Sequence, residues 1–138
     1  MGIVLPDGDL SNQTLEYARQ WITEHILVVG VISLPAHTFV PFGAGPKSSV
    51  LICVKPTNDI IPDDYPVFFC KLNKIGYDVS GKVQYKRNEF GNIIDKDGRE
   101  LESIDGNIDL SKAAVDTDIP ELIERWEEFY DKNKKYLW

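Results

Sequence analysis

The chain has 138 residues, a length that suits one domain with its own hydrophobic core. Its composition is 43% hydrophobic and 27% charged, as in ordinary globular proteins, and no apolar run approaches the roughly 18–20 residues of a membrane span. The formal net charge of −7 argues against a domain that holds DNA mainly through its own phosphate contacts. Any contact with nucleic acid is therefore expected to be local.

The first 34 residues have the pattern of a strand, a helix and a second strand. Residues 2–6 (GIVLP) form a short apolar run that Pro-Asp-Gly closes, which is typical of a strand followed by a turn. Ser11 or Asn12 can cap a helix over about residues 13–25. Residues 26–34 are apolar at nearly every position, which suits a strand covered on both faces. The pattern predicts a βαβ unit with parallel strands. One face of the expected helix carries Leu15, Ala18, Ile22 and His25.

The next segments predict an antiparallel addition to this unit. Residues 35–47 are rich in Pro and Gly and are expected to form a loop, and residues 48–55 (SSVLICVK) form the next strand. No crossover helix separates this strand from the preceding one, so antiparallel pairing is the economical arrangement. Residues 56–66 are expected to be a surface loop, and residues 67–72 either a strand or the start of a short helix ending near Gly76.

The C-terminal half divides into a polar region and a helix. Residues 77–107 are rich in Gly, Asp and Asn, show no internal repeat, and are expected to form a hairpin or loop on the surface. Asp118 and Glu121 have the spacing of a capping box, and apolar residues then follow helical spacing over about residues 119–136. We therefore divide the chain into an α/β sheet region (1–76), a polar hairpin or loop region (77–117) and an amphipathic helix (118–138).

Cys53 and Cys70 lie in apolar, strand-like stretches. We expect buried free thiols in a reducing cytoplasm, a location that agrees with the lack of a secretory signal at the N-terminus. A disulfide or a metal pair is the alternative, although the chain has no Cys-x-x-Cys pattern.

Two loops resemble ligand motifs but fail on spacing. The segment Gly43–Ser48 (GAGPKS) lacks the interval between glycines of a phosphate-binding loop, and a strand follows it where a helix is needed. The segment Asp95–Gly98 resembles part of a calcium loop, but Ile93 and Ile104 stand where that loop needs acidic residues. We expect an ordinary turn there and no metal site.

The remaining candidates lie at strand ends. His37 follows the strongest strand, where open sheets place ligand contacts, whereas His25 near a helix end is expected to be structural. Asp7 and Asp9 follow the first strand, as catalytic carboxylates or as ordinary turn residues. From the residues alone, no set completes a catalytic site.

Several short motifs occur in an order that resembles one family, the adenine-specific DNA methyltransferase (M) subunits of type I restriction–modification systems. Residues 3–8 (IVLPDG) lead into residues 10–22 (LSNQTLEYARQWI), and residues 31–55 resemble the family's VxSLPxxxFxPxGxGxKTS stretch and the strand after it. Residues 74–78 (KIGYD) and 85–87 (YKR) also look like the segment that follows. The resemblance covers about residues 2–95.

The resemblance implies the second half of a Rossmann-like methyltransferase sheet: the fifth strand, its helix, and the sixth and seventh strands, the last inserted antiparallel. It also implies that the Phe39–Lys47 loop lies near the pocket for the flipped-out adenine, because such enzymes must extrude the base to reach its amino group. Phe39 and Phe42 are then candidates to stack on the base, or they pack within the loop. The same loop carries His37, Gly43, Gly45 and Lys47, with Lys47 near the DNA backbone.

Two defining elements of the family are absent. No two of the eight prolines are adjacent, so the catalytic NPP[FY] tetrapeptide is missing, as is the Gly-rich turn that holds S-adenosylmethionine. The family's Lys-Thr-Ser is Lys47-Ser48-Ser49 here. We therefore expect a fragment or one piece of a split gene that is inactive alone, with no catalytic, cofactor-binding or metal residue in this chain.

The expected partners follow from the same resemblance. They are the missing N-terminal half, the DNA specificity and restriction subunits, and DNA; no membrane contact is expected. The first strand would normally pair with an upstream strand, so we also expect self-association through an exposed strand edge. The alternative function is a non-catalytic interaction module whose C-terminal helix docks on a partner subunit of the restriction–modification complex.

Overall fold

The computed structural model describes residues 1–56 and 60–137, so residues 57–59 of the expected 56–66 loop and residue 138 of the expected C-terminal segment lie outside the described residues. Its strands are β1 (Gly2–Pro6), β2 (Leu27–Ser33), β3 (Ser48–Val54), β4 (Phe68–Lys71), β5 (Ser103–Ile104) and β6 (Asn107–Ile108). Its helices are α1 (Asp7–Ser11), α2 (Glu16–His25) and α3 (Ile119–Leu137). None of the helices within the described residues is long and apolar enough to cross a bilayer.

The strands β1 to β4 form one mixed sheet in the order β1-β3-β2-β4. The strand β3 lies between β1 and β2 and is antiparallel to both, so β1 and β2 run in the same direction without pairing with each other. The strand β4 pairs in parallel with β2. The expected antiparallel pairing of residues 48–55 is confirmed, and residues 67–72 contain a strand rather than a helix. The fold is therefore α/β.

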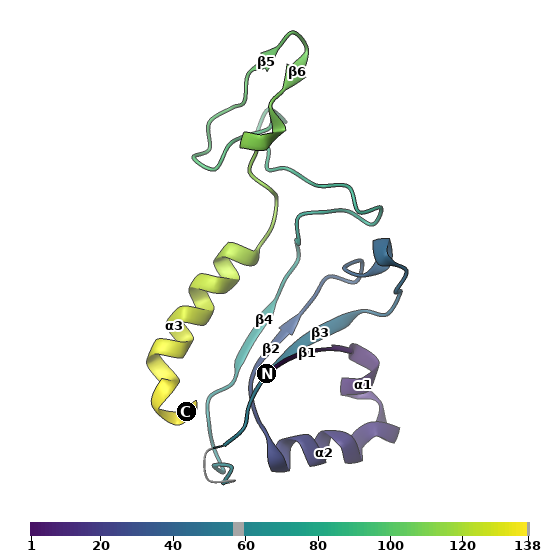
Figure 1. Ribbon diagram of the computed structural model, residues 1–138, viewed down its shortest axis with the longest axis vertical. Helices are drawn as coiled ribbons and strands as arrows, with labels where there is room; N and C mark the ends of the chain where they lie inside the picture. The colour runs from purple at the N-terminus through teal and green to yellow at the C-terminus, as the bar shows by residue number, and fades with distance from the viewer. Residues whose placement is uncertain (57–59, 138) are drawn as a thin grey trace.

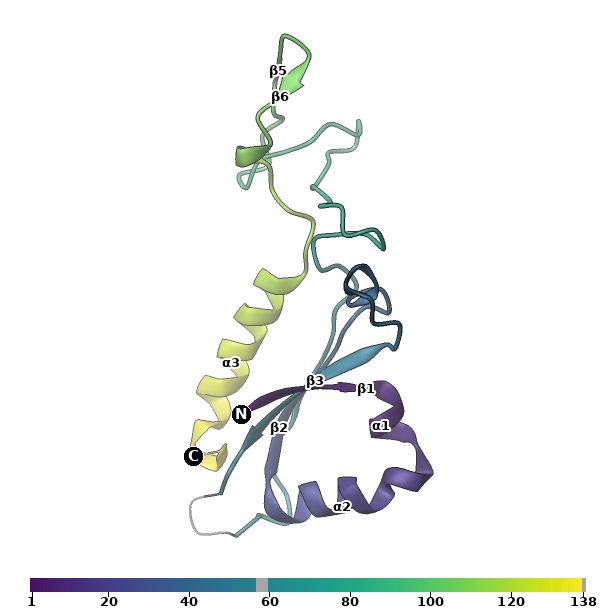
Figure 2. The ribbon, with the colours of Figure 1, turned by 45° about the vertical axis from the view of Figure 1, so that its right-hand side comes forward.

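The helix α3 covers one face of this sheet (Figures 1 and 2). Trp126 and Phe129 pack against the buried side chains of Leu27 and Val29, and both rings also contact Phe68. A Cβ atom at Gly30 would lie 3.0 Å from the Trp126 ring, so the missing side chain of this glycine lets the helix approach the sheet closely. The main core lies between α3 and the sheet.

The helix α2 lies on the opposite face (Figure 1). Its Ile22 side chain lines an apolar cavity of about 270 Å³ together with Val28, Val31 and Leu51. Asn12 accepts a hydrogen bond from the backbone N–H of Thr14 at 3.0 Å and so caps a 3-10 turn over Gln13–Leu15. The expected helix over about residues 13–25 begins only after this turn, at Glu16. His25 does not share the buried face as expected. It is exposed and stacks on Trp21 at a centroid distance of 4.6 Å. Residues four apart share one strip of a helix, so His25 lies with the exposed Trp21 and not with the half-buried Ala18 and Ile22.

Residues 77–117 form an extended arm that projects beyond the end of the sheet (Figures 1 and 2). Three of its turns share one construction, over residues 78–81, 88–91 and 95–98. In each, an Asp or Asn oxygen accepts from the backbone N–H two and four residues later, and the fourth residue is a glycine with φ between 82° and 85°. The arm therefore contains a structural repeat, which sequence inspection misses because the spacing is irregular.

The start of α3 differs from the predicted capping box. The Asp118 carboxylate accepts hydrogen bonds from the backbone N–H groups of Asn73 and Lys74, at 2.8 and 2.9 Å, just after β4. These two bonds lower the pKa of Asp118. The carboxylate thus links the start of α3 to the backbone that follows β4, a contact that local spacing cannot indicate because the two segments lie more than 40 residues apart.

Candidate functional site

A polar cluster joins the ends of β1, β2 and β3. The Lys47 ammonium donates to the Asp7 carboxylate and, at 2.7 Å, to the Ser33 hydroxyl. Ser49 Oγ donates to the second oxygen of Asp7 at 2.7 Å, and the Asp7 backbone N–H donates to the Lys47 carbonyl at 2.8 Å. The sequence-predicted Asp7 and Lys47 therefore meet, together with two serines that sequence reasoning did not single out.

The charges within this cluster are matched. Hydrogen bonds from Lys47 and Ser49 lower the pKa of Asp7, so the carboxylate stays ionised at neutral pH. The Lys47 ammonium is a donor to both Asp7 and Ser33, so it does not act here as a base toward the serine hydroxyl. These contacts anchor the end of the 35–47 loop. They do not form a nucleophile with its general base.

Asp7 and Asp9 both lie in the helix α1 and not in the expected strand-end turn, because Pro6 stands at the N-cap and the two acids suit the first turn of a helix. Asp9, the other predicted carboxylate, lies outside this set of bonds. Its backbone carbonyl accepts a hydrogen bond of 3.2 Å from the Arg19 guanidinium. That contact ties α1 to α2. The structure therefore does not bring Asp7 and Asp9 together around a shared group.

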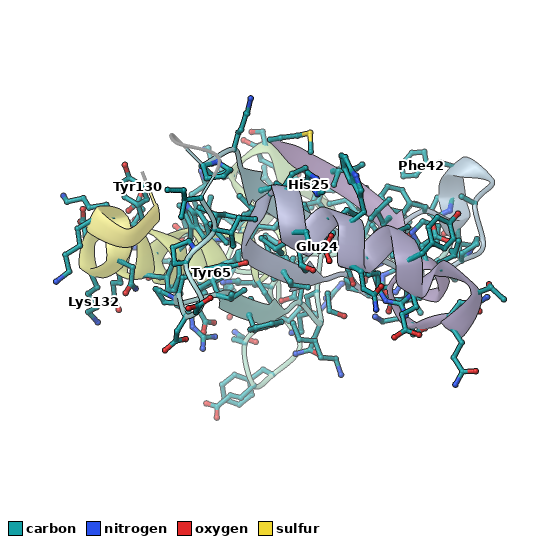
Figure 3. All side chains as sticks on the ribbon, turned by 90° about the horizontal axis from the view of Figure 1, so that it is seen from below. Glu24, His25, Phe42, Tyr65, Tyr130 and Lys132 are labelled. Atoms are coloured by element: carbon teal, nitrogen blue, oxygen red, sulfur yellow. The ribbon has the colours of Figure 1, made fainter. Side chains whose placement is uncertain are left out.

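The 35–47 loop presents an aromatic side chain to solvent. Its 3-10 turn η2 (Val40–Phe42) ends at Gly43, whose φ of 86° lies in the left-handed region that favours glycine. Phe42 is 73% exposed and lies on the outer side of the molecule, far from Tyr130 and Lys132 of α3 (Figure 3). Phe39 is half-buried, so the two phenylalanines of the motif have different environments. Gly45 has open space around its Cβ position and a φ outside that region, so no close contact there requires a glycine.

Tyr77, which sequence reasoning did not select, lies between two of the predicted residues. Its ring meets Phe42 edge-on at a centroid distance of 6.1 Å and His37 at 6.4 Å. A cavity of about 320 Å³ adjoins it, lined also by Lys74, Gln84 and Asp116. This volume is at the lower end of the range of small-ligand pockets. The KIGYD segment at residues 74–78 belongs to the family resemblance, and that was the signal that could have pointed to Tyr77.

The two cysteines and the acidic residues do not form a reactive or metal-binding site within the described residues. Cys53 is buried and Cys70 half-buried, and both are free thiols as expected; burial raises the pKa of Cys53. Among residues 1–56 and 60–137, no group of three or more His, Cys, Asp or Glu side chains could hold a metal ion.

The rings of Phe42 and Tyr77 form an aromatic surface at the end of the sheet, and His37 lies beside it with hydrogen-bonding ring nitrogens. Such a surface suits binding of a planar ligand.

No family model matches this chain, and no curated protein matches it. The function of the chain is therefore inferred from its motifs and from the geometry of the loop and its neighbours.

Proposed function

We propose that this chain is the C-terminal part of the catalytic domain of an adenine-specific DNA methyltransferase, of the kind found in type I restriction–modification systems. Its role is to supply the target-base side of the site. The single observation that carries this proposal is the position of β3, antiparallel between β1 and β2. That is the arrangement which the family resemblance implies for the seventh, fifth and sixth strands of a Rossmann-like sheet.

The placement of the loop supports the same proposal. The Phe39–Lys47 loop lies between β2 and β3, and Lys47 at its end binds Asp7, the first residue of α1 directly after β1. Ligands of open α/β sheets bind outside the carboxyl ends of parallel strands, which here are the ends of β1 and β2. Phe42 at this edge is exposed and can stack on an extruded base.

The proposed activity needs groups that these 138 residues do not contain. The NPP[FY] tetrapeptide and the Gly-rich cofactor turn are absent, so no residue of this chain is assigned to S-adenosylmethionine or to the transfer of its methyl group. A second polypeptide segment must supply both. The DNA specificity and restriction subunits, DNA itself and a cytoplasmic location belong to the same proposal.

The edge of β1 is the proposed docking place for that segment. β1 is the end strand of the sheet, and within the described residues no strand pairs with its outer side. Its side chains Ile3 and Val4 are 39% and 48% exposed. An open strand edge with exposed aliphatic side chains favours addition of another strand, and when the missing segment is not supplied, a second copy of this chain is expected to take its place.

Binding of 2-aminopurine riboside, an uncharged fluorescent analogue of adenosine, tests the base-binding role. The nucleoside avoids the repulsion that DNA phosphates would meet from a chain of net charge −7. Stacking on Phe42 is expected to quench its fluorescence in a saturable way, and Phe42→Ala is expected to abolish the quenching. Phe90→Ala, which removes an equally exposed ring from the arm, serves as the matched control. Equal quenching by the wild type and Phe42→Ala would refute the proposed role.

A second candidate is a non-catalytic module that docks on a partner subunit. The apolar face of α3 is already packed on the sheet through Leu122, Trp126 and Phe129, but Ile119 and Ile123 are 40% and 50% exposed on the same helix. These two side chains favour a contact with a partner subunit on the part of α3 that lies next to the face packed on the sheet. Such a module would bind its partner without quenching 2-aminopurine riboside, and Ile123→Lys would weaken that binding.

A further inference from the structure

We infer that Tyr77 is a positioning residue that fixes the turn carrying Phe42 and so sets the aromatic surface offered to the base. This inference rests on the proposed function for its ligand, a purine base. Its structural part stands on contacts between two segments that lie 35 residues apart in the sequence and come together at the end of the sheet.

Two hydrogen bonds join Tyr77 to the 35–42 turn. The Tyr77 hydroxyl donates to the Thr38 carbonyl at 2.7 Å, and His37 Nε2 lies 3.1 Å from the Tyr77 carbonyl oxygen. Thr38 is 7% exposed, and its own hydroxyl donates to the Pro35 carbonyl at 2.7 Å. The tyrosine therefore holds the turn at its buried base, while Phe42 projects from its outer end.

The ring of Tyr77 supports Phe42 directly. The two rings meet at an interplanar angle of 86°, the edge-to-face geometry that aromatic pairs prefer. Phe42 is 73% exposed, and among the described residues Tyr77 is the one aromatic ring that contacts it. Without it, Phe42 would be free to populate other rotamers.

Tyr77 itself is held from both sides of its segment. Gly76 is buried with φ of 92°, and a Cβ atom there would lie 2.7 Å from Val115 of the returning arm. A Cβ atom at Gly81 would lie 3.1 Å from Pro41, so Gly81 also packs closely against the turn that carries Phe42. Tyr77 therefore lies between two closely packed glycines, one against the returning arm and one against the turn.

The test compares Tyr77→Leu and Tyr77→Phe with Tyr17→Leu and Tyr17→Phe, since Tyr17 is an exposed tyrosine on α2 far along the chain from this turn. The first measurement is the NMR spectrum of the backbone amides of residues 38–40 and 42–44 and of the Phe42 ring. The second is quenching of 2-aminopurine riboside. Tyr77→Phe keeps the ring and removes only the hydroxyl, which separates the two contributions and protects the test against a leucine variant that does not fold.

We expect Tyr77→Leu to shift the amides of residues 38–40 and 42–44 and to raise the apparent Kd for the nucleoside about tenfold, and Tyr77→Phe to raise it about threefold. The Tyr17 variants should leave both readouts unchanged. If the wild type does not quench but Tyr77→Leu moves the loop signals, the proposed function fails while the fastening of the turn stands. The inference would be overturned if the Tyr77 variants, like the Tyr17 variants, changed neither the loop signals nor the quenching.

Discussion

Asp7→Asn removes the charge from the cluster that fastens the loop to β1. The Asp7 carboxylate accepts from Lys47 through one oxygen and from Ser49 through the other. The neutral amide can still accept from one partner, so the main loss is the ion pair with Lys47. Both side chains are 37% exposed, and water screens the attraction, so we expect a loss of about 1 kcal/mol in the free energy of unfolding. For a chain of this size, that corresponds to a fall in Tm of about 3 °C.

The loss of unfolding free energy caused by Asp7→Asn should become smaller as the pH falls. The folded protein lowers the pKa of Asp7 below its ordinary value of 3.8, so the ionised carboxylate stabilises the fold above that value and the contribution disappears as pH falls through the lower, folded pKa. Wild type and Asp7→Asn are therefore expected to differ most near neutral pH and to converge in acid.

Urea unfolding at pH 7 and at a series of values below 4 measures this difference. Asp9→Asn, two residues further along, is the matched control, and a double-mutant cycle with Lys47→Met isolates the pair. Equal stability of wild type and Asp7→Asn at pH 7 would show that the ionised Asp7 does not stabilise the fold, as would a difference that persists undiminished in acid.

Three further predictions follow from packing and backbone geometry. Trp126→Ala should cost about 3 kcal/mol in urea unfolding, because the ring covers the sheet core; a loss below about 1 kcal/mol would mean that α3 is not its main cover. Gly76→Ala should cost more than about 1 kcal/mol, since the residue has a positive φ and no room for a Cβ atom, and a neutral effect in the same assay would contradict the tight approach of Val115. Phe42→Ala should change stability by less than about 0.5 kcal/mol while abolishing nucleoside quenching, and a large destabilisation would assign Phe42 to the core.

The local elements of this fold could be predicted from the sequence, because they depend on patterns within a few residues. Continuous apolar runs predicted β1, β2 and β3, and helical spacing of apolar residues predicted α3. The antiparallel direction of β3 followed from the short connection before it. Its place between β1 and β2 did not follow from residue patterns, because pairing between distant strands depends on tertiary packing; only the family resemblance implied it.

The less predictable features depend on contacts between distant segments. Asp118 has the spacing of a helix cap, yet its carboxylate binds the backbone after β4, more than 40 residues away. Tyr77 lies in a polar stretch without periodicity, and only the folded chain shows that it contacts His37 and Phe42. The motif residues Asp7 and Lys47 were found from the sequence, but their pairing was not, because no local pattern links positions 40 residues apart.

The proposed part of this chain in adenine methylation is tested by measuring methyl transfer to adenine in duplex DNA. Labelled S-adenosylmethionine would be supplied to this chain alone, to a polypeptide carrying the Gly-rich cofactor turn and the NPP[FY] tetrapeptide of a type I M subunit, and to both together. We expect transfer to the adenine amino group only with both, and a large reduction of that transfer by Phe42→Ala. The proposed function would be wrong if the two polypeptides associate and fold but transfer no methyl group, or if transfer is equal without this chain.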